Sequence, residues 1–98
     1  MTLREQQSLF VKMVAALIEH AYNLGYELTF GDAYANDGHR IGSFHYKRLA
    51  IDLNLFKDGV FCPDSEDHRP LGEFWESLGG TWGGRFKQPD GNHYSLGE

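Results

Sequence analysis

Cysteine is nearly absent from the sequence, since Cys62 is the only one in the chain. A single thiol excludes an internal disulfide, so the core rather than a covalent link has to hold the fold together. Long hydrophobic runs are lacking too. The most apolar stretch, residues 9–24, is interrupted by Lys12 and Glu19, and we therefore expect no membrane-spanning helix.

The features of a secreted or nucleic-acid-binding chain are also missing. The first residues, "MTLREQQ", contain no basic start followed by an apolar run and a cleavage site, so we expect synthesis in the cytoplasm without a signal peptide. Positive charge is scarce, because 9 lysines and arginines stand against 14 acidic residues and the net charge is −5. A nucleic-acid partner would require a basic face, and we expect none.

The chain does contain enough apolar material for one core. Hydrophobic residues make up 41% and aromatic residues 14% of the sequence, which excludes a disordered chain. The length of 98 residues suits a single domain over residues 1–98, and no repeat or linker divides it.

The hydrophobic pattern predicts an α+β fold. Spacings of three and four are typical of an amphipathic helix, and strict alternation is typical of a strand with one buried face. The elements expected are a helix over residues 8–24, strands from 26 and over 48–56, a hairpin return at 60–61, a helix over 70–78 and a last strand after Asp90-Gly91. We therefore expect a small, mainly antiparallel sheet packed against an N-terminal amphipathic helix and a second short helix.

Two of the histidines each come with a carboxylate at short range. His45 precedes Asp52 by seven residues, and His93 follows Asp90 by three. A catalytic zinc ion takes about three nitrogen or oxygen ligands from the protein and keeps one position open for water. His45, Asp52 and His93 would supply such a set. Asp90 would remain as the base that removes a proton from the water.

An alternative interpretation of these spacings needs no metal. Asp52 lies on the polar side of the expected strand, so it would simply face solvent. Asp90 precedes a glycine and is a good turn former. His39 and His68 lie in polar loops, where we expect them to be solvated. Spacing alone leaves both interpretations open.

Taken together, the two pairs resemble the motifs of a metallopeptidase family, the D-Ala-D-Ala carboxypeptidases and dipeptidases. Ser43-Phe44-His45 followed by Asp52 matches an S-x-H-x(6)-D motif, and "DGNH" at 90–93 matches a C-terminal acid-x-x-His motif. The segments "DLNLFKDG", "DHRPLGEFWESLGGTWGGRF" and "DGNHYS" resemble a branch of phage endolysins that cleave the L-alanyl-D-glutamate bond of peptidoglycan. The resemblance extends over most of residues 26–95.

The resemblance implies a zinc peptidase that hydrolyses the peptidoglycan stem peptide. It assigns His45, Asp52 and His93 as Zn2+ ligands and Asp90 as the catalytic base. The L-alanyl-D-glutamate bond is the expected substrate, and the D-Ala-D-Ala bond is the alternative. The resemblance also implies action on the cell wall after release through a holin-type pore. From the sequence we expect no separate wall-binding domain, so the catalytic domain alone would have to find the wall. The oligomeric state stays open.

The expected substrate contacts are less well defined. In many family members an arginine follows the tyrosine of "GDAY", but Ala35 stands here, so Arg40 would have to replace it. Ser43 belongs to the first motif and is a further candidate. Trp82, flanked by glycines, would either wall the substrate groove or belong to the core. Arg48 stands where carboxypeptidase members often have glycine. Without a substitute for the arginine, the alternative is a zinc-binding module that has lost activity and only binds the wall.

Overall fold

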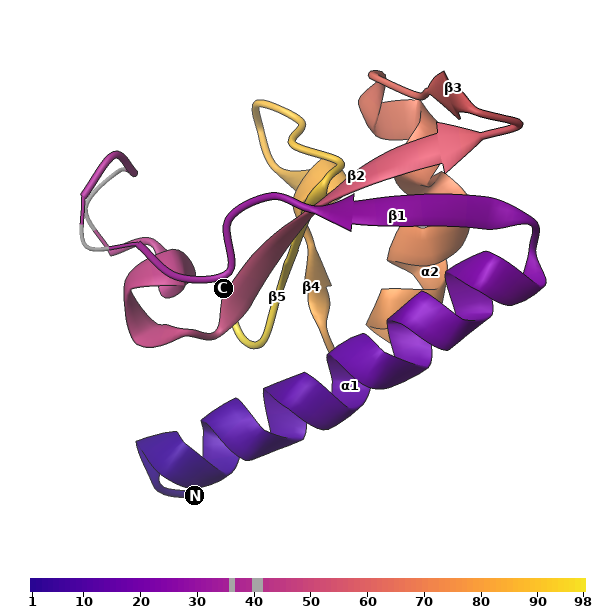
Figure 1. The fold of residues 1–98 in the computed structure, drawn as a ribbon. Coiled ribbons are helices and arrows are strands. Elements are labelled where there is room, and N and C mark those ends of the chain that lie inside the picture. The colour runs from indigo at the N-terminus through magenta and orange to yellow at the C-terminus, as the bar shows by residue number, and fades with distance from the viewer. Residues whose placement is uncertain (36, 40–41) are drawn as a thin grey trace.

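The computed structural model describes residues 1–35, 37–39 and 42–98. In that part of the chain two α-helices and a five-stranded sheet form the α+β fold predicted from the hydrophobic pattern (Figure 1). The helices and strands are α1 (Leu3–Asn23), β1 (Tyr26–Phe30), β2 (Ala50–Lys57), β3 (Val60–Phe61), α2 (Arg69–Ser77), β4 (Thr81–Trp82) and β5 (His93–Ser95). Short 3₁₀ helices occupy Phe44–Lys47, Ser65–His68 and Gly83–Arg85.

Helix α1 begins earlier than the hydrophobic spacing predicts. The Thr2 side chain accepts a hydrogen bond from the backbone of Glu5, and the Glu5 carboxylate accepts one from the backbone of Thr2. This reciprocal pair satisfies two N–H groups that a helix end leaves without partners, so the helix extends beyond its apolar stripe. At the other end Gly25, with φ of +88°, provides the predicted stop.

Strand β2 is the centre of an antiparallel sheet. β1 and β5 flank β2, β4 follows β5, and β3 also pairs with β2 in the predicted hairpin. The register places Asp52 opposite His93 and Ile51 opposite Tyr94. Because successive side chains of a strand point to opposite faces, Asp52 and His93 share one face of the sheet. Ile51 and Tyr94 share the other face.

The core lies between the helices and one face of the sheet (Figure 1). Phe10 of α1 meets Trp75 of α2 edge to face, and Trp75 meets Tyr94 of β5 in the same way. The apolar side of β2 is buried as predicted, with Leu49 to Leu55 at alternate positions 5% exposed or less. Neither described helix combines the length and the hydropathy needed to cross a membrane. The buried apolar residues of this core are Phe10, Met13, Leu17, Ala21, Leu49, Ile51, Leu53, Leu55, Leu71, Trp75, Trp82 and Tyr94.

Candidate metal centre

The backbone of Asp52 is fixed from both directions. Its N–H donates to the carbonyl of Asp32 at 2.8 Å, and its carbonyl accepts from the N–H of Gly31 at 2.7 Å. A Cβ at Gly31 would lie 3.1 Å from both the Cβ and the carbonyl oxygen of Asp52, so glycine permits this close approach. On the other side of β2, Asp52 is paired with His93. The direction of the Asp52 carboxylate is therefore set by rigid backbone.

A short 3₁₀ helix, Phe44–Lys47, carries His45, which the sequence pattern did not predict to be helical. The Ser43 hydroxyl accepts a hydrogen bond from the His45 N–H at 3.3 Å and caps the helix. The helix ends at Arg48, which has a left-handed conformation with φ of 57°. This conformation explains why glycine suits position 48, because an L side chain is strained there.

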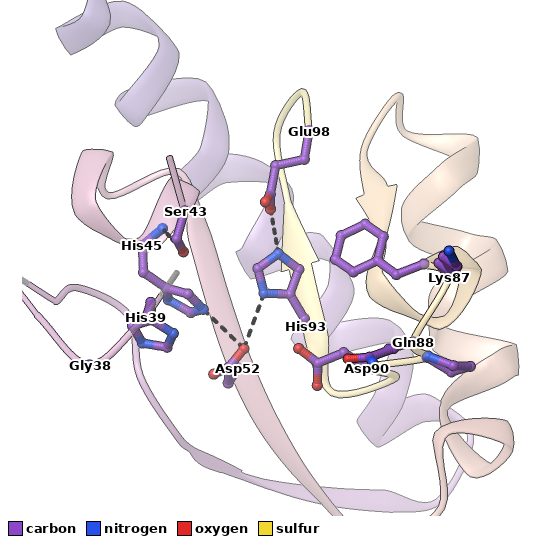
Figure 2. A pocket seen from close by; sticks show the side chains of 12 residues that line it. Gly38, His39, Ser43, His45, Asp52, Lys87, Gln88, Asp90, His93 and Glu98 are labelled. Atoms are coloured by element: carbon purple, nitrogen blue, oxygen red, sulfur yellow. Dashed lines mark hydrogen bonds and ion pairs between the residues drawn. The ribbon is translucent and has the colours of Figure 1, made fainter. Parts of the chain in front are cut away.

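Three side chains from these elements converge on one point (Figure 2). Asp52 Oδ1 lies 3.2 Å from His45 Nε2 and 3.4 Å from His93 Nδ1. The side chains of His45, Asp52 and His93 are 2%, 18% and 6% exposed. Their ligand atoms all lie within 4.8 Å of one another.

The spacing of these atoms fits a metal ion better than it fits hydrogen bonding. Ligand atoms about 2.0–2.1 Å from a tetrahedral zinc ion are separated by roughly 3.3 Å. The distances from Asp52 Oδ1 to the two histidine nitrogens, 3.2 and 3.4 Å, are close to this value. Among the described residues, the buried Asp52 Oδ1 has no well-directed hydrogen bond. A buried acceptor without a partner is costly, and a cation would remove that cost. The three residues could therefore hold a metal ion.

The protonation of the two histidines differs because their surroundings differ. Burial lowers the pKa of His45 and outweighs the nearby Asp52 charge, so its ring is held neutral. Burial acts in the same direction on His93, but the carboxylates of Asp52 and Glu98 outweigh it and raise the pKa of His93. A neutral ring nitrogen is the form that binds a metal, so His45 is ready to act as a ligand.

Asp90 is held beside these three residues by a tight turn. Its N–H donates to the carbonyl of Gly83 at 2.9 Å, and its carbonyl accepts from the N–H of His93 at 3.1 Å. A Cβ at Gly83 would lie 2.2 Å from the Asp90 carbonyl oxygen, so only glycine fits there. Figure 2 shows the Asp90 carboxylate projecting towards Asp52 and His93. Burial and the Asp52 charge raise the pKa of Asp90, which makes its carboxylate a better proton acceptor.

The side chain of Trp82 belongs to the core, which is the second of the two positions that the sequence left open, so Trp82 is not a substrate contact in the groove. It is 1% exposed, and its indole Nε1 donates to the carbonyl of Gly91 at 2.8 Å. Space for the ring exists because neighbouring positions lack side chains: a Cβ at Gly72 or Gly84 would lie 2.1 or 2.3 Å from the indole. Trp82 therefore supports the turn between Asp90 and His93 from behind.

A groove of about 660 Å³ opens in front of the three converging side chains. Ser43 lines it, but its hydroxyl is committed to the His45 backbone and the residue is only 6% exposed. Arg40, the expected substitute for the arginine replaced by Ala35, lies outside the described residues. The further lining residues are Gly38, His39, Phe86, Lys87, Gln88, Pro89 and Glu98.

Sequence reasoning misjudged or missed three residues around this centre. His39 lines the groove rather than standing free in solvent, and its ring stacks on His45 with 4.2 Å between centroids. His68 is 3% exposed and pairs with the Tyr94 hydroxyl, so the expectation of a solvated loop residue is wrong. Glu98 interacts with His93, although nothing in the spacing of the two residues indicates it.

Comparisons with known proteins give one family and one fold. The sequence profile of a family described as D-alanyl-D-alanine carboxypeptidase matches residues 36–96, which include His45, Asp52, Asp90 and His93. No curated protein matches the sequence. The crystal structure of the Serratia marcescens L-Ala D-Glu endopeptidase ChiX is similar, with a TM-score of 0.65 and 17% sequence identity. The alignment covers 88% of this chain and 78% of the other, and at this identity it establishes the shared fold.

Proposed function

Because the chain belongs to the D-alanyl-D-alanine carboxypeptidase family, we propose that it is a zinc-dependent peptidase of the peptidoglycan stem peptide. The observation that carries this proposal is the convergence of His45, Asp52 and His93 at metal-ligand distances beside a carboxylate. The groove in front of them gives a substrate access to all of these groups.

We assign metal binding to His45, Asp52 and His93, and proton transfer to Asp90. His45 and His93 offer ring nitrogens, and Asp52 offers an oxygen with negative charge, a donor set that suits zinc. Bound zinc supplies Lewis acidity, which polarises a peptide carbonyl and lowers the pKa of water. Asp90 takes up the proton of the attacking water and delivers it to the leaving amine. Its raised pKa helps the first of these transfers at neutral pH.

The bond that we propose for cleavage is the one between L-alanine and D-glutamate. The support is the sequence resemblance to endolysins with this specificity and the fold shared with an L-Ala D-Glu endopeptidase. The phage-like resemblance also supports a role as a lysis enzyme that is made in the cytoplasm and reaches the wall through a pore formed by another protein. The family description favours a second candidate, hydrolysis of the D-Ala-D-Ala terminus.

Digestion of purified peptidoglycan by the zinc-loaded protein tests the proposal. Mass analysis of the fragments, with and without a chelator, should show new amino-terminal D-glutamate ends only when zinc is present. Release of free D-alanine instead would assign the second candidate. The absence of any fragment from the zinc-loaded protein would contradict both activities.

The missing arginine favours a further alternative, a module that binds zinc and the wall but lacks activity. The backbone N–H of Ala35 donates to the His45 carbonyl at 3.3 Å, so position 35 lies beside the centre and supplies no cation there. Wall binding measured by sedimentation with insoluble peptidoglycan separates the two ideas. If the protein is an inactive module, the wild type and Asp90→Asn should bind the wall equally well, and neither should release fragments.

A further inference from the structure

Glu98 contacts the edge of the His93 ring that points away from Asp52. Its carboxylate Oε1 lies 2.5 Å from His93 Nε2, while His93 Nδ1 faces Asp52 Oδ1 at 3.4 Å. Figure 2 shows the imidazole ring between the two carboxylates. The Glu98 side chain is 13% exposed, so solvent competes little for this contact.

The short contact has a consequence for the tautomer of His93. A neutral imidazole carries its proton on one nitrogen and a lone pair on the other, and only the lone pair can bind a metal. A carboxylate that accepts a hydrogen bond from Nε2–H keeps the proton there and leaves Nδ1 free. It also fixes the rotation of the ring and makes Nδ1 more basic.

We propose that Glu98 is a positioning residue that holds His93 in the orientation and tautomer needed for binding a metal through Nδ1. This inference rests on the proposed function, because it assumes that His45, Asp52 and His93 share a zinc ion. Glu98 touches neither the other two ligands nor the base in the contacts of the described residues, so its effect passes through His93.

The backbone holds Glu98 in place although it is the last residue of the sequence. The N–H of Leu96 donates to the carbonyl of Leu49 at 2.9 Å, and the Thr81 hydroxyl donates to the Glu98 backbone oxygen at 3.3 Å. Gly97 between them has φ of +101°, a conformation that L side chains rarely adopt. This turn brings the Glu98 side chain back to His93.

The other histidine of the group is held differently. The buried Nδ1 of His45 has no hydrogen-bond partner among the described residues, and its ring stacks on His39 instead. Among the described residues, Glu98 therefore contacts His93 and not His45. Removing the Glu98 carboxylate should lower the zinc affinity through His93 alone and leave the other two ligands in place.

The alternative is that Glu98 merely stabilises the fold as an ion pair with His93. In that case its removal would lower the free energy of unfolding of the metal-free protein without a specific effect on zinc. Zinc affinity, measured by competition with a chromophoric chelator, separates the two roles. Far-ultraviolet circular dichroism of each metal-free variant checks that it is folded.

The variants are Glu98→Ala and Glu98→Gln, with Glu19→Ala as the matched control. Glu19 is exposed on α1, and its replacement makes the same change in net charge away from the groove. We expect the Kd for zinc to rise about 10- to 100-fold in Glu98→Ala. The rise should be smaller in Glu98→Gln, whose amide oxygen still accepts from Nε2–H, and the control should match wild type.

A Kd for Glu98→Ala within about twofold of wild type would overturn the inference. If that variant does not fold, nitrogen-15 NMR of the zinc-loaded wild type decides, because it reports which ring nitrogen of His93 carries the proton. Protonated Nε2 supports the inference, and protonated Nδ1 contradicts it. Failure of the zinc site itself is distinguishable from both, since wild type would then bind no zinc. Failure of the peptidase activity alone is detected separately, as zinc-loaded wild type that binds zinc but releases no fragment from peptidoglycan.

Discussion

Two buried histidines, His93 of β5 and His68, which contacts the next residue of that strand, Tyr94, show how much a histidine's partner matters. They are 5% and 3% exposed, so burial does not distinguish them. His93 lies between the carboxylates of Asp52 and Glu98, which raise its pKa against the effect of burial. The closest partner of His68 is the hydroxyl of Tyr94 at 2.8 Å, and burial lowers its pKa to about 4.

This difference shows that one face of β5 belongs to the groove and the other to the core. His93 points into the groove, whereas Tyr94, its neighbour along the strand, points into the core. On the groove face, the carboxylates of Asp52 and Glu98 flank His93. On the core face, His68 meets the ring and hydroxyl of Tyr94 and stays neutral at pH 7. Substitutions on the groove face should therefore abolish chemistry, and substitutions on the core face should change stability.

The largest effect should come from His93→Ala. This substitution removes one of the three proposed ligand atoms and leaves the Asp52 carboxylate without a neighbour on that side. We expect zinc content, measured by elemental analysis, to fall to background and peptidoglycan hydrolysis to become undetectable. The circular dichroism spectrum should keep its native shape, because His93 contributes little to the apolar core. A variant with full zinc content and activity would refute the ligand assignment.

Asp90→Asn should separate metal binding from catalysis. The amide is nearly the same size as the carboxylate but cannot accept the proton of the attacking water. We expect kcat to fall by about 10²- to 10⁴-fold, the usual contribution of a general base. Zinc content should match wild type, because Asp90 is not among the three ligands. Activity near the wild-type level would exclude Asp90 as the base.

His68 should make the stability of the fold sensitive to acid. Its pKa is about 4 in the folded protein and 6.5 in the unfolded chain, so only the unfolded chain binds a proton between these values. The contribution of His68 to the free energy of unfolding is therefore complete above pH 6.5, and it is lost as the pH decreases towards 4. The loss is on the order of 3 kcal/mol.

Urea unfolding at pH 7.5 and 4.5 checks this effect. His68→Gln cannot take up the proton, so its stability should change less between the two pH values than that of wild type. The difference between the two proteins isolates His68 from the other groups that titrate in this range. Equal pH dependence in both proteins would show that His68 is not responsible.

The smallest effect is expected from Arg48→Gly at the end of the helix that carries His45. Glycine adopts the left-handed conformation of this position, with φ of 57°, without strain. The gain is reduced by the greater freedom of glycine in the unfolded chain and by loss of the contact between the Arg48 guanidinium and the Tyr34 ring. We expect a net stabilisation of about 0.5 kcal/mol in urea unfolding, with unchanged zinc affinity. A loss of stability would mean that the ring contact outweighs the strain.

The parts of the fold that depend on local pattern could be predicted from the sequence. Alternation along β2 identified the buried side and placed Asp52 on the other, because side chains of a strand alternate whatever lies around them. The hairpin to β3 followed from the turn residues between the two strands. The α+β class follows from the order of such local elements.

The misjudged residues depend on tertiary contacts that the local sequence pattern does not show. The glycines flanking Trp82 left open whether its ring is exposed or buried. In the structure the indole packs against Gly72 and Gly84, so glycine here indicates close packing rather than an open loop. His68 looks like a loop residue until Tyr94 is placed beside it. Glu98 reaches His93 only because Gly97 turns the chain back.

The register that pairs Asp52 with His93 would also couple the proposed metal binding to folding. These two residues meet only after β2 and β5 have paired, so the unfolded chain offers no preformed site. An ion bound here therefore acts by mass action on the folding equilibrium, by about 2.7 kcal/mol when its free concentration is 100 times its Kd. Pairing of these strands closes a long stretch of chain, which is slow relative to local contacts. Zinc should consequently slow unfolding more than it accelerates folding, and the protein would resist proteolysis for longer wherever zinc is supplied.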